Sequence, residues 1–164
     1  MPANNLFHVA IKTAKPEASK RFYEQVFGMT ESPRPPFEFP GYWMQVATPQ
    51  GGHILHLYTG PAALNNDGQV PTGMGAVDHI ALSAHGFDET RKRLRALGIP
   101  FRERTVPGTP LWQIFTHDPN GVHFELNFHS ALEARDGVAV DPDNFLKAGL
   151  QWFDPEAYRQ FETA

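Results

Sequence analysis

The sequence predicts an α+β protein made of two βαβββ modules, and an internal repeat is the main reason. The segment 7–11 (FHVAI) matches 78–82 (DHIAL), and 52–57 (GHILHL) matches 121–126 (GVHFEL). Hydrophobic periodicity follows the same order in both halves: strand, helix, strand, strand, strand. A supersecondary unit that occurs twice is expected to combine with its copy, so we expect both modules to form one curved mixed sheet.

Composition indicates a globular chain and excludes several classes of partner. The 164 residues suit a single domain over 1–164, and 41% of them are hydrophobic. The net charge of −4 comes without a basic stripe, so we expect no nucleic-acid partner. No apolar run approaches the roughly 18 residues of a membrane span, and the N-terminus lacks the apolar core of a signal peptide. We therefore expect a cytoplasmic protein with no membrane partner.

The first module is expected over residues 5–59. Its helix begins at Lys15-Pro16, because proline suits a first turn, and it ends at Gly28, because glycine suits a C-cap. Four prolines within 30–40 exclude a central strand, so this stretch is expected to be a loop or a broken edge strand. The strands of this module are expected at 6–13, 41–48 and 53–59.

The second module is expected over residues 76–128. It follows a linker at 60–75 that is rich in Gly, Pro, Asn and Asp. Its helix is expected at 87–97. The segment 118–121 (DPNG) predicts a tight turn, because Asn-Gly accepts the positive φ that a hairpin requires. The strands of this module are expected at 76–84, 100–106, 111–117 and 122–128.

Residues 129–164 fall outside the repeat and form an expected C-terminal helical extension. The Asp-Pro pairs at 141–142 and 154–155 predict two short helices, which end at Leu150 and Phe161. The aromatic side chains of this tail need apolar cover. They either pack on the chain's own sheet or cover a partner subunit or a pocket mouth. These aromatic residues are Trp152, Phe153, Tyr158 and Phe161.

The repeat places four possible metal ligands at related positions. His8 matches His79, and His56 matches Glu125. His8 and His56 are 48 positions apart in the sequence, and His79 and Glu125 are 46 positions apart. Since the chain has no cysteine, its ligands must be imidazole or carboxylate, and such a set suits Zn²⁺, Ni²⁺, Mn²⁺ or Fe²⁺. One carboxylate leaves a divalent site with a net charge of about +1, which favours an oxyanion, enolate or phenolate ligand. We therefore expect the curved sheet to surround a metal site.

Each candidate ligand also has a purely structural interpretation. A single histidine on a strand is usually a hydrogen-bonded core residue, whereas a carboxylate in an apolar strand is rarely left unpaired. Four unrelated core residues would not fall on duplicate positions, which favours ligation. His123 shares the expected face of Glu125 and is expected to line the pocket or support a ligand. His53 and His117 lie near strand ends and are expected at the surface.

The chain resembles the vicinal-oxygen-chelate superfamily, which includes glyoxalase I, extradiol dioxygenases and bleomycin-resistance proteins. The resemblance covers about residues 5–128. It is carried by FHVA at 7–10, RFYEQVFGM at 21–29, DHIALS at 78–83 and DPNGVHFEL at 118–126. It implies paired βαβββ modules that form a cupped sheet with a divalent metal at its centre.

The resemblance also implies roles for individual residues. His8, His79 and Glu125 fall on the three ligand positions used across metal-dependent members. His56 falls where glyoxalase I carries a metal-bound glutamate that shuttles a proton. It is therefore either a fourth ligand or an acid–base group, a role that suits a histidine because the unperturbed pKa of this residue type lies near neutrality. The expected catalytic residues are Glu125 and His56, and the expected metal ligands are His8, His56, His79 and Glu125.

These roles favour a glyoxalase-like lyase or isomerase that acts on a small-molecule substrate chelated through two adjacent oxygens. One alternative is an extradiol-type Fe(II) ring-cleaving dioxygenase, in which two histidines and one glutamate hold the iron. Another is a metal-free protein that sequesters its ligand, as bleomycin-resistance proteins do. The resemblance and the aromatic tail also favour a homodimer.

Overall fold

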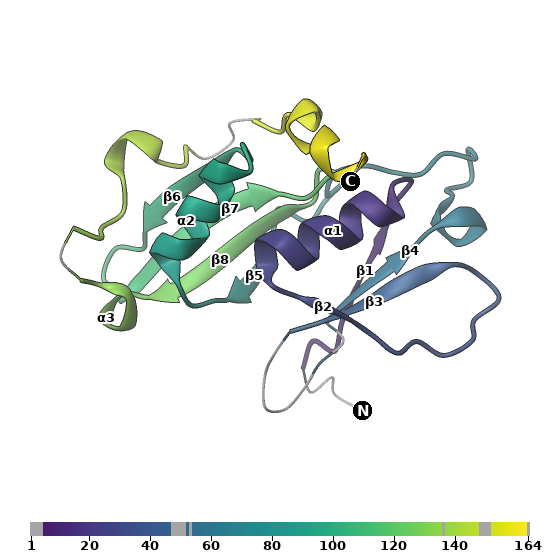
Figure 1. The fold of residues 1–164 in the computed structure, drawn as a ribbon, viewed down its shortest axis with the longest axis horizontal. Helices are drawn as coiled ribbons and strands as arrows, with labels where there is room; N and C mark the ends of the chain where they lie inside the picture. The colour runs from purple at the N-terminus through teal and green to yellow at the C-terminus, as the bar shows by residue number, and fades with distance from the viewer. Residues whose placement is uncertain (1–4, 47–51, 53, 136, 148–151, 164) are drawn as a thin grey trace. The chain divides into compact units, whose positions relative to one another are not determined.

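The computed structural model describes residues 5–46, 52, 54–135, 137–147 and 152–163. The chain divides into two compact units, the first comprising Met1–Thr72 with Gln160–Ala164 and the second Gly73–Arg159. Each unit contains one four-stranded sheet and one long helix (Figure 1). The boundary between the units falls inside the stretch that the sequence predicts to be a linker.

The first unit is a mixed sheet with one helix, in the predicted order. Its strands lie in the order β1-β4-β3-β2, with β1 parallel to β4 and the other pairs antiparallel. Because β2 pairs on one side only, the proline-rich stretch begins with a short edge strand, as the prolines allow. The elements are β1 (Val9–Lys12), α1 (Pro16–Phe27), β2 (Thr30–Ser32), β3 (Gly41–Gln45) and β4 (Leu55–Tyr58).

Helix α1 begins and ends where the sequence predicts. Pro16 lies in its first turn, where a missing N–H costs nothing. Gly28 ends the helix in the left-handed conformation, with φ of 65°, and its N–H donates to the carbonyl of Tyr23. The buried face of the helix consists of Ala18, Ser19, Phe22, Tyr23 and Val26.

The second unit repeats this topology. Its strands lie in the order β5-β8-β7-β6, again with one parallel pair, β5 with β8, and two antiparallel pairs. The predicted tight turn joins β7 to β8, with Gly121 at φ of 79° and the Asp118 carboxylate accepting the N–H groups of Asn120 and Val122. The elements are β5 (Ile80–Ser83), α2 (Phe87–Ala96), β6 (Phe101–Thr105), β7 (Leu111–His117) and β8 (His123–His129).

The two faces of the second sheet differ in chemistry. β8 reads HFELNFH, so the alternation of a strand places Phe124, Leu126 and Phe128 on one face. Helix α2 packs on this face, where the Phe87 ring contacts the rings of Trp112 and Phe128. The opposite face carries His123, Glu125 and Asn127 from β8, and Gln113, Phe115 and His117 from β7.

The strand register confirms the repeat residue by residue. Ala10 pairs with His56 across β1 and β4, and Ala81 pairs with Glu125 across β5 and β8. His8 directly precedes β1, just as residue 79 directly precedes β5. The four predicted ligand positions are therefore equivalent pairs in two sheets of the same topology. The protein is of the α+β class, with two βαβββ modules.

The C-terminal tail is less helical than its sequence predicts. Around Pro142 a single 3-10 turn, η2 (Pro142–Asn144), replaces the first short helix, and residues 148–150 of that prediction lie outside the described residues. The chain leaves the helical path because its backbone pairs with the β6 strand: the N–H of Leu146 donates to the carbonyl of Glu103 at 3.1 Å. The second predicted helix is a 3-10 helix, η3 (Pro155–Phe161). Two further short elements are η1 (Gly60–Ala63) and α3 (Ser130–Glu133).

The aromatic residues of the tail pack on the chain itself. Tyr158 and Phe161 are each 1% exposed. In the first unit the Phe161 ring contacts that of Phe22, at 5.7 Å between centroids. In the second unit the Tyr158 hydroxyl donates to the carbonyl of His117 at 2.8 Å. Of the two interpretations of this tail, packing on the chain's own core holds for these two residues. Among the described residues, no helix is both long and apolar enough to span a lipid bilayer.

Candidate metal centre

In the second unit, His79 and Glu125 bring an imidazole nitrogen and a carboxylate oxygen close together. The distance from His79 Nε2 to Glu125 Oε2 is 3.4 Å, longer than an ordinary N–H···O hydrogen bond. Two ligand atoms that each lie about 2.1 Å from one metal, at angles of 90–109°, are about 3.0–3.4 Å apart. The Glu125 residue is only 7% exposed, and a buried carboxylate requires a partner. The spacing therefore suits two ligands of one cation.

The other ring nitrogen of His79 is held by an acidic neighbour. His79 Nδ1 lies 2.6 Å from Asp78 Oδ1, and this hydrogen bond lowers the pKa of the Asp78 carboxyl. When Nδ1 donates to Asp78, the lone pair of the imidazole is left on Nε2, on the side of Glu125. An outer carboxylate that fixes the tautomer in this way is the usual companion of a metal-binding histidine. Asp78 is a supporting residue that the sequence did not single out.

In the first unit, His8 and His56 are neighbours in an aromatic stack. The two rings lie 4.0 Å apart between centroids at an interplanar angle of 19°, and the opposite face of His56 stacks on Trp43 at 4.3 Å and 9°. His56 is 6% exposed. His8 Nδ1 is buried, and within the described part of the chain no hydrogen-bond partner meets it. A buried imidazole nitrogen without a protein partner is suited to bind a metal ion or a water molecule.

The stack also bears on which imidazole binds. A metal lies in the plane of the imidazole that binds it, along the nitrogen lone pair. Because the planes of His8 and His56 are almost parallel and about 4 Å apart, the two rings do not aim lone pairs at a common point in this arrangement. The geometry favours one ligand and one supporting or acid–base group, and the partnerless Nδ1 favours His8 as the ligand.

His117 corrects a prediction from the sequence. It is expected at the surface as a residue near a strand end, but it is only 8% exposed. Its ring stacks on His123 at 4.7 Å and meets the ring of Trp152 at 4.4 Å between centroids. The prediction is wrong because the C-terminal tail covers this end of β7. Burial lowers the pKa of His117 to about 4, so its ring is neutral at pH 7.

A family profile identifies the superfamily to which the chain belongs. The profile described as Glyoxalase/Bleomycin resistance protein/Dioxygenase superfamily matches residues 5–126, which span both modules. The chain belongs to this superfamily. None of the curated proteins that were compared matches the chain.

Solved structures of the superfamily share the fold at low sequence identity. Lactoylglutathione lyase from Agrobacterium tumefaciens is 21% identical, with a TM-score of 0.57 over 80% of this chain and 98% of its own. A glyoxalase family protein from Bacillus anthracis is 20% identical, with a TM-score of 0.60 over 79% and 98%. A variant of the fosfomycin resistance protein FosX from Listeria monocytogenes is 18% identical, with a TM-score of 0.57 over 77% and 93%. The last was crystallised with Mn(II) and 1S,2S-dihydroxypropylphosphonic acid.

A second set of possible ligands overlaps the first in this member of the superfamily. Asp78, His79 and His123 each offer one ligand atom within 4.8 Å of the others. The side chain of Asp78 is 90% exposed and already pairs with His79 Nδ1, whereas Glu125 is buried. The pair His79 and Glu125 is therefore the better candidate, with Asp78 as the residue that orients the histidine. His123 lies beside this pair, as its strand position predicts, and burial lowers its pKa.

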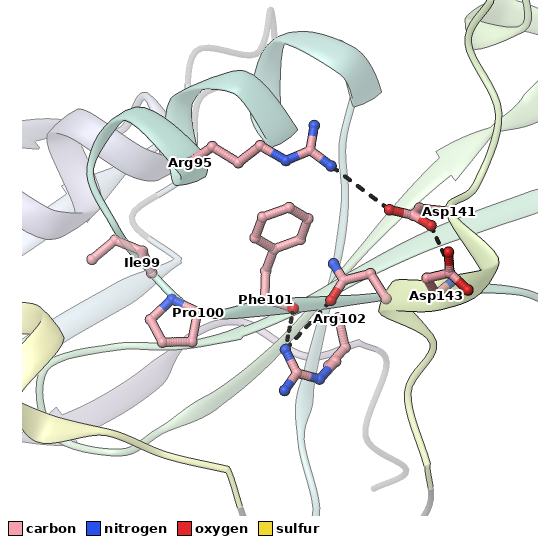
Figure 2. A pocket seen from close by; sticks show the side chains of 8 residues that line it. Arg95, Ile99, Pro100, Phe101, Arg102, Asp141 and Asp143 are labelled. Atoms are coloured by element: carbon pink, nitrogen blue, oxygen red, sulfur yellow. Dashed lines mark hydrogen bonds and ion pairs between the residues drawn. The ribbon is translucent and has the colours of Figure 1, made fainter.

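A hollow elsewhere in the second unit is distinct from these residues. It has a volume of about 380 Å³ and lies where the end of α2, the start of β6 and the η2 turn meet (Figure 2). Its cationic groups already have partners. Arg95 faces Asp141 at 4.0 Å, and Arg102 donates to the carbonyl of Phe101 at 2.8 Å. None of the predicted ligands lines this hollow.

Proposed function

We propose that this protein is a divalent-metal-dependent enzyme, a glyoxalase-like lyase or isomerase whose substrate is chelated through vicinal oxygens. The observation that carries the proposal is the pair His79 and Glu125, with nitrogen and oxygen 3.4 Å apart and an outer carboxylate on the histidine. Membership of the superfamily supports it, as does Mn(II) in the structure of a FosX variant. His8 is the proposed third ligand, and His56 is the proposed ligand or base.

The proposed chemistry divides between the metal and the side chains. When bound, the metal supplies Lewis acidity that stabilises an enolate or similar oxyanion. Glu125 and His56 are the groups that accept and return the proton. A carboxylate bound through one oxygen keeps the other available for hydrogen bonding, and a neutral imidazole is a suitable base near pH 7. The stacking of His56 favours the base role. The stack restrains the imidazole ring of His56, but it does not direct the lone pair of this ring to the point at which the lone pair of His8 is aimed.

The same stacking also supports a second candidate function, that of an extradiol-type dioxygenase. If His56 is not a ligand, the protein ligands are two histidines and one glutamate, the set that holds Fe(II) in such enzymes. Metal identity and oxygen consumption separate the two. Protein loaded separately with Fe²⁺, Mn²⁺, Ni²⁺ and Zn²⁺ would be assayed against lactoylglutathione, fosfomycin and catechols. Turnover of a catechol with O₂ consumption by the Fe²⁺ form alone supports the dioxygenase. Absence of binding to all four ions would instead support metal-free sequestration of a ligand.

We also propose a homodimer. Stable dimer interfaces usually bury more than about 1,200 Å² in total. Large apolar side chains are exposed in both units of the chain and are available to contribute to such an interface. They include Leu6, Phe7, Val77 and Leu132. Sedimentation velocity over a dilution series is expected to give a dimer mass, and a monomer mass at all concentrations would contradict this.

A further inference from the structure

A row of polar side chains crosses the second sheet on the face opposite α2. It begins with Arg104 on β6, continues with Gln113 on β7 and ends with Asn127 and Glu125 on β8. The register places Arg104 opposite Gln113, and Gln113 opposite Asn127. Residues directly opposite each other in a sheet project to the same face, and so do residues two apart on one strand. The row therefore ends at the proposed metal ligand.

Hydrogen bonds connect the row in one direction. Arg104 Nε donates to Gln113 Oε1 at 3.1 Å, and Gln113 Nε2 donates to Asn127 Oδ1 at 3.0 Å. Asn127 Nδ2 then donates to Glu125 Oε1 at 2.6 Å. An arginine only donates and a carboxylate only accepts, so each amide between them has a single satisfactory orientation. The guanidinium of Arg104 is also placed 5.4 Å from the centre of the Phe115 ring.

This arrangement assigns different tasks to the two oxygens of Glu125. Oε1 accepts the short hydrogen bond from Asn127, and Oε2 lies 3.4 Å from His79 Nε2. We infer that Asn127 is a positioning residue that makes Glu125 a monodentate metal ligand through Oε2, and that Gln113 and Arg104 hold the Asn127 amide in the required orientation. This inference rests on the proposed function, because it assumes that Glu125 binds a metal.

The fold alone does not require the row. In the first module the register that matches Gln113 opposite Asn127 is Gly41 opposite Tyr58, and neither residue repeats the amide pair. Gln113 is 4% exposed, and a buried amide lowers stability unless it is fully hydrogen-bonded. The second sheet therefore contains two hydrogen-bonded amides at positions where its copy has a glycine and a tyrosine. They are present only in the module that supplies the carboxylate.

Titration calorimetry with Mn²⁺ tests the inference in chelator-treated protein. Asn127→Leu removes the donor to Glu125, and Gln113→Met removes only the residue that orients the Asn127 amide. Removal of an outer partner typically weakens metal binding by about 10–100-fold, which is the loss expected for Asn127→Leu, with a smaller loss for Gln113→Met. Thr116→Val is the matched control, because Thr116 is buried on β7 and donates to the carbonyl of Pro100 at 2.9 Å, but faces away from the row. Its Mn²⁺ affinity is expected to equal that of the wild type.

Infrared spectroscopy of the Mn²⁺-loaded protein supplies a readout that a merely structural role would not change. The splitting between the two carboxylate stretches of Glu125 is expected to be wide in the wild type, as for monodentate binding. It is expected to narrow in Asn127→Leu, where Oε1 is released to bind as well. Equal affinity and equal splitting in the wild type and Asn127→Leu would overturn the inference while leaving the proposed metal site intact. A wild-type protein that binds no Mn²⁺, Zn²⁺, Ni²⁺ or Fe²⁺ would overturn the proposed function and the inference together.

Discussion

The two modules share a backbone plan but surround equivalent residues with different chemistry. His56 and Glu125 occupy the same register position, each opposite an alanine of the parallel strand. In the first module the imidazole is held between two rings by stacking. In the second, the carboxylate is held at one oxygen by an amide and faces an imidazole with the other.

The difference shows what duplication provides and what it leaves to the side chains. The repeated topology places four polar residues at matched sites, and the cross-strand neighbours then decide what each one does. Opposite His56 the first module has Trp43, and opposite Glu125 the second has Phe115. The indole of Trp43 stacks on the imidazole of His56 at 4.3 Å between centroids and an angle of 9°. Stacking of this kind restrains a whole ring, whereas a hydrogen bond directs one named atom.

The largest expected effect comes from removal of the carboxylate that distinguishes the second module. Glu125→Ala is expected to abolish Mn²⁺ binding, because it removes a buried anionic ligand and leaves the His79 nitrogen as the only ligand of this pair. Calorimetry measures the binding, and Glu38→Ala, which removes an exposed glutamate, is the control. Full metal occupancy in Glu125→Ala would mean that the cation binds elsewhere.

The equivalent change in the first module is expected to affect turnover and not affinity. His56→Gln keeps a polar side chain in the stack but removes the base. If His56 moves a proton, metal remains bound and kcat falls by about 10²–10⁴. If His56 is instead a ligand, metal affinity falls by at least about 10-fold. Calorimetry and kinetics on the same variant separate these outcomes, and no change in either would exclude both roles.

Much of this architecture could be predicted from the sequence, because the repeat and its periodicity are local signals. The order of helix and strands along each module, the ends of α1 and the Asp118–Gly121 turn all follow from residues a few positions apart. The shared face of His123, Glu125 and Asn127 also follows from simple alternation. These are cases in which local pattern and final structure agree.

The features that the sequence did not reveal depend on contacts between distant segments. Asn127 acquires its orientation from Gln113 and Arg104 on two other strands, a relation that only the register discloses. His117 is buried by a tail whose path the sequence did not predict. Around Pro142 the helix signal was overridden because the backbone beyond it pairs with β6. Each of these outcomes required the pairing of strands or segments to be known first.

The second module has a pH-dependent contribution to stability at a position where the first module has none. At the position that corresponds to His117, the first module has Gln45, which does not titrate. The pKa of His117 is about 4 in the folded protein and near 6.5 when unfolded, because burial beside His123 disfavours its charged form. Between these values the unfolded chain binds the proton and the folded chain does not. The stabilising contribution is therefore complete above pH 6.5 and is lost as pH falls to about 4, by at most about 3 kcal/mol.

Urea denaturation between pH 4 and 7 measures this effect. In His117→Gln the pH dependence of the unfolding free energy is expected to be smaller than in the wild type over the same interval. Tyr158, whose hydroxyl donates to the His117 carbonyl, remains in place in this variant. Identical pH dependence in both proteins would show that His117 is not the group responsible.

The smallest expected effect comes from the backbone of the first module. Gly41 occupies the position that Gln113 has in the second, and a Cβ there would lie 2.1 Å from the carbonyl oxygen of Leu57. Gly41→Ala must therefore displace a strand, and overpacking of this kind typically destabilises by about 1–3 kcal/mol. Gln113→Ala, at the equivalent position, introduces no such clash. Comparison of the melting curves of the two variants tests whether the modules differ at this position for steric reasons. An unchanged Tm for Gly41→Ala would contradict the steric explanation for the glycine.

The most direct test of the proposed metal centre is the ligand environment of bound metal in wild-type protein purified without chelator. Elemental analysis combined with X-ray absorption spectroscopy would report both the stoichiometry and the ligand atoms. We predict one divalent metal per chain, bound by imidazole nitrogen and carboxylate oxygen at about 2.0–2.2 Å. Protein that contains no divalent metal and takes none up, or metal surrounded by water oxygen alone, would contradict the assignment of His79 and Glu125 as ligands.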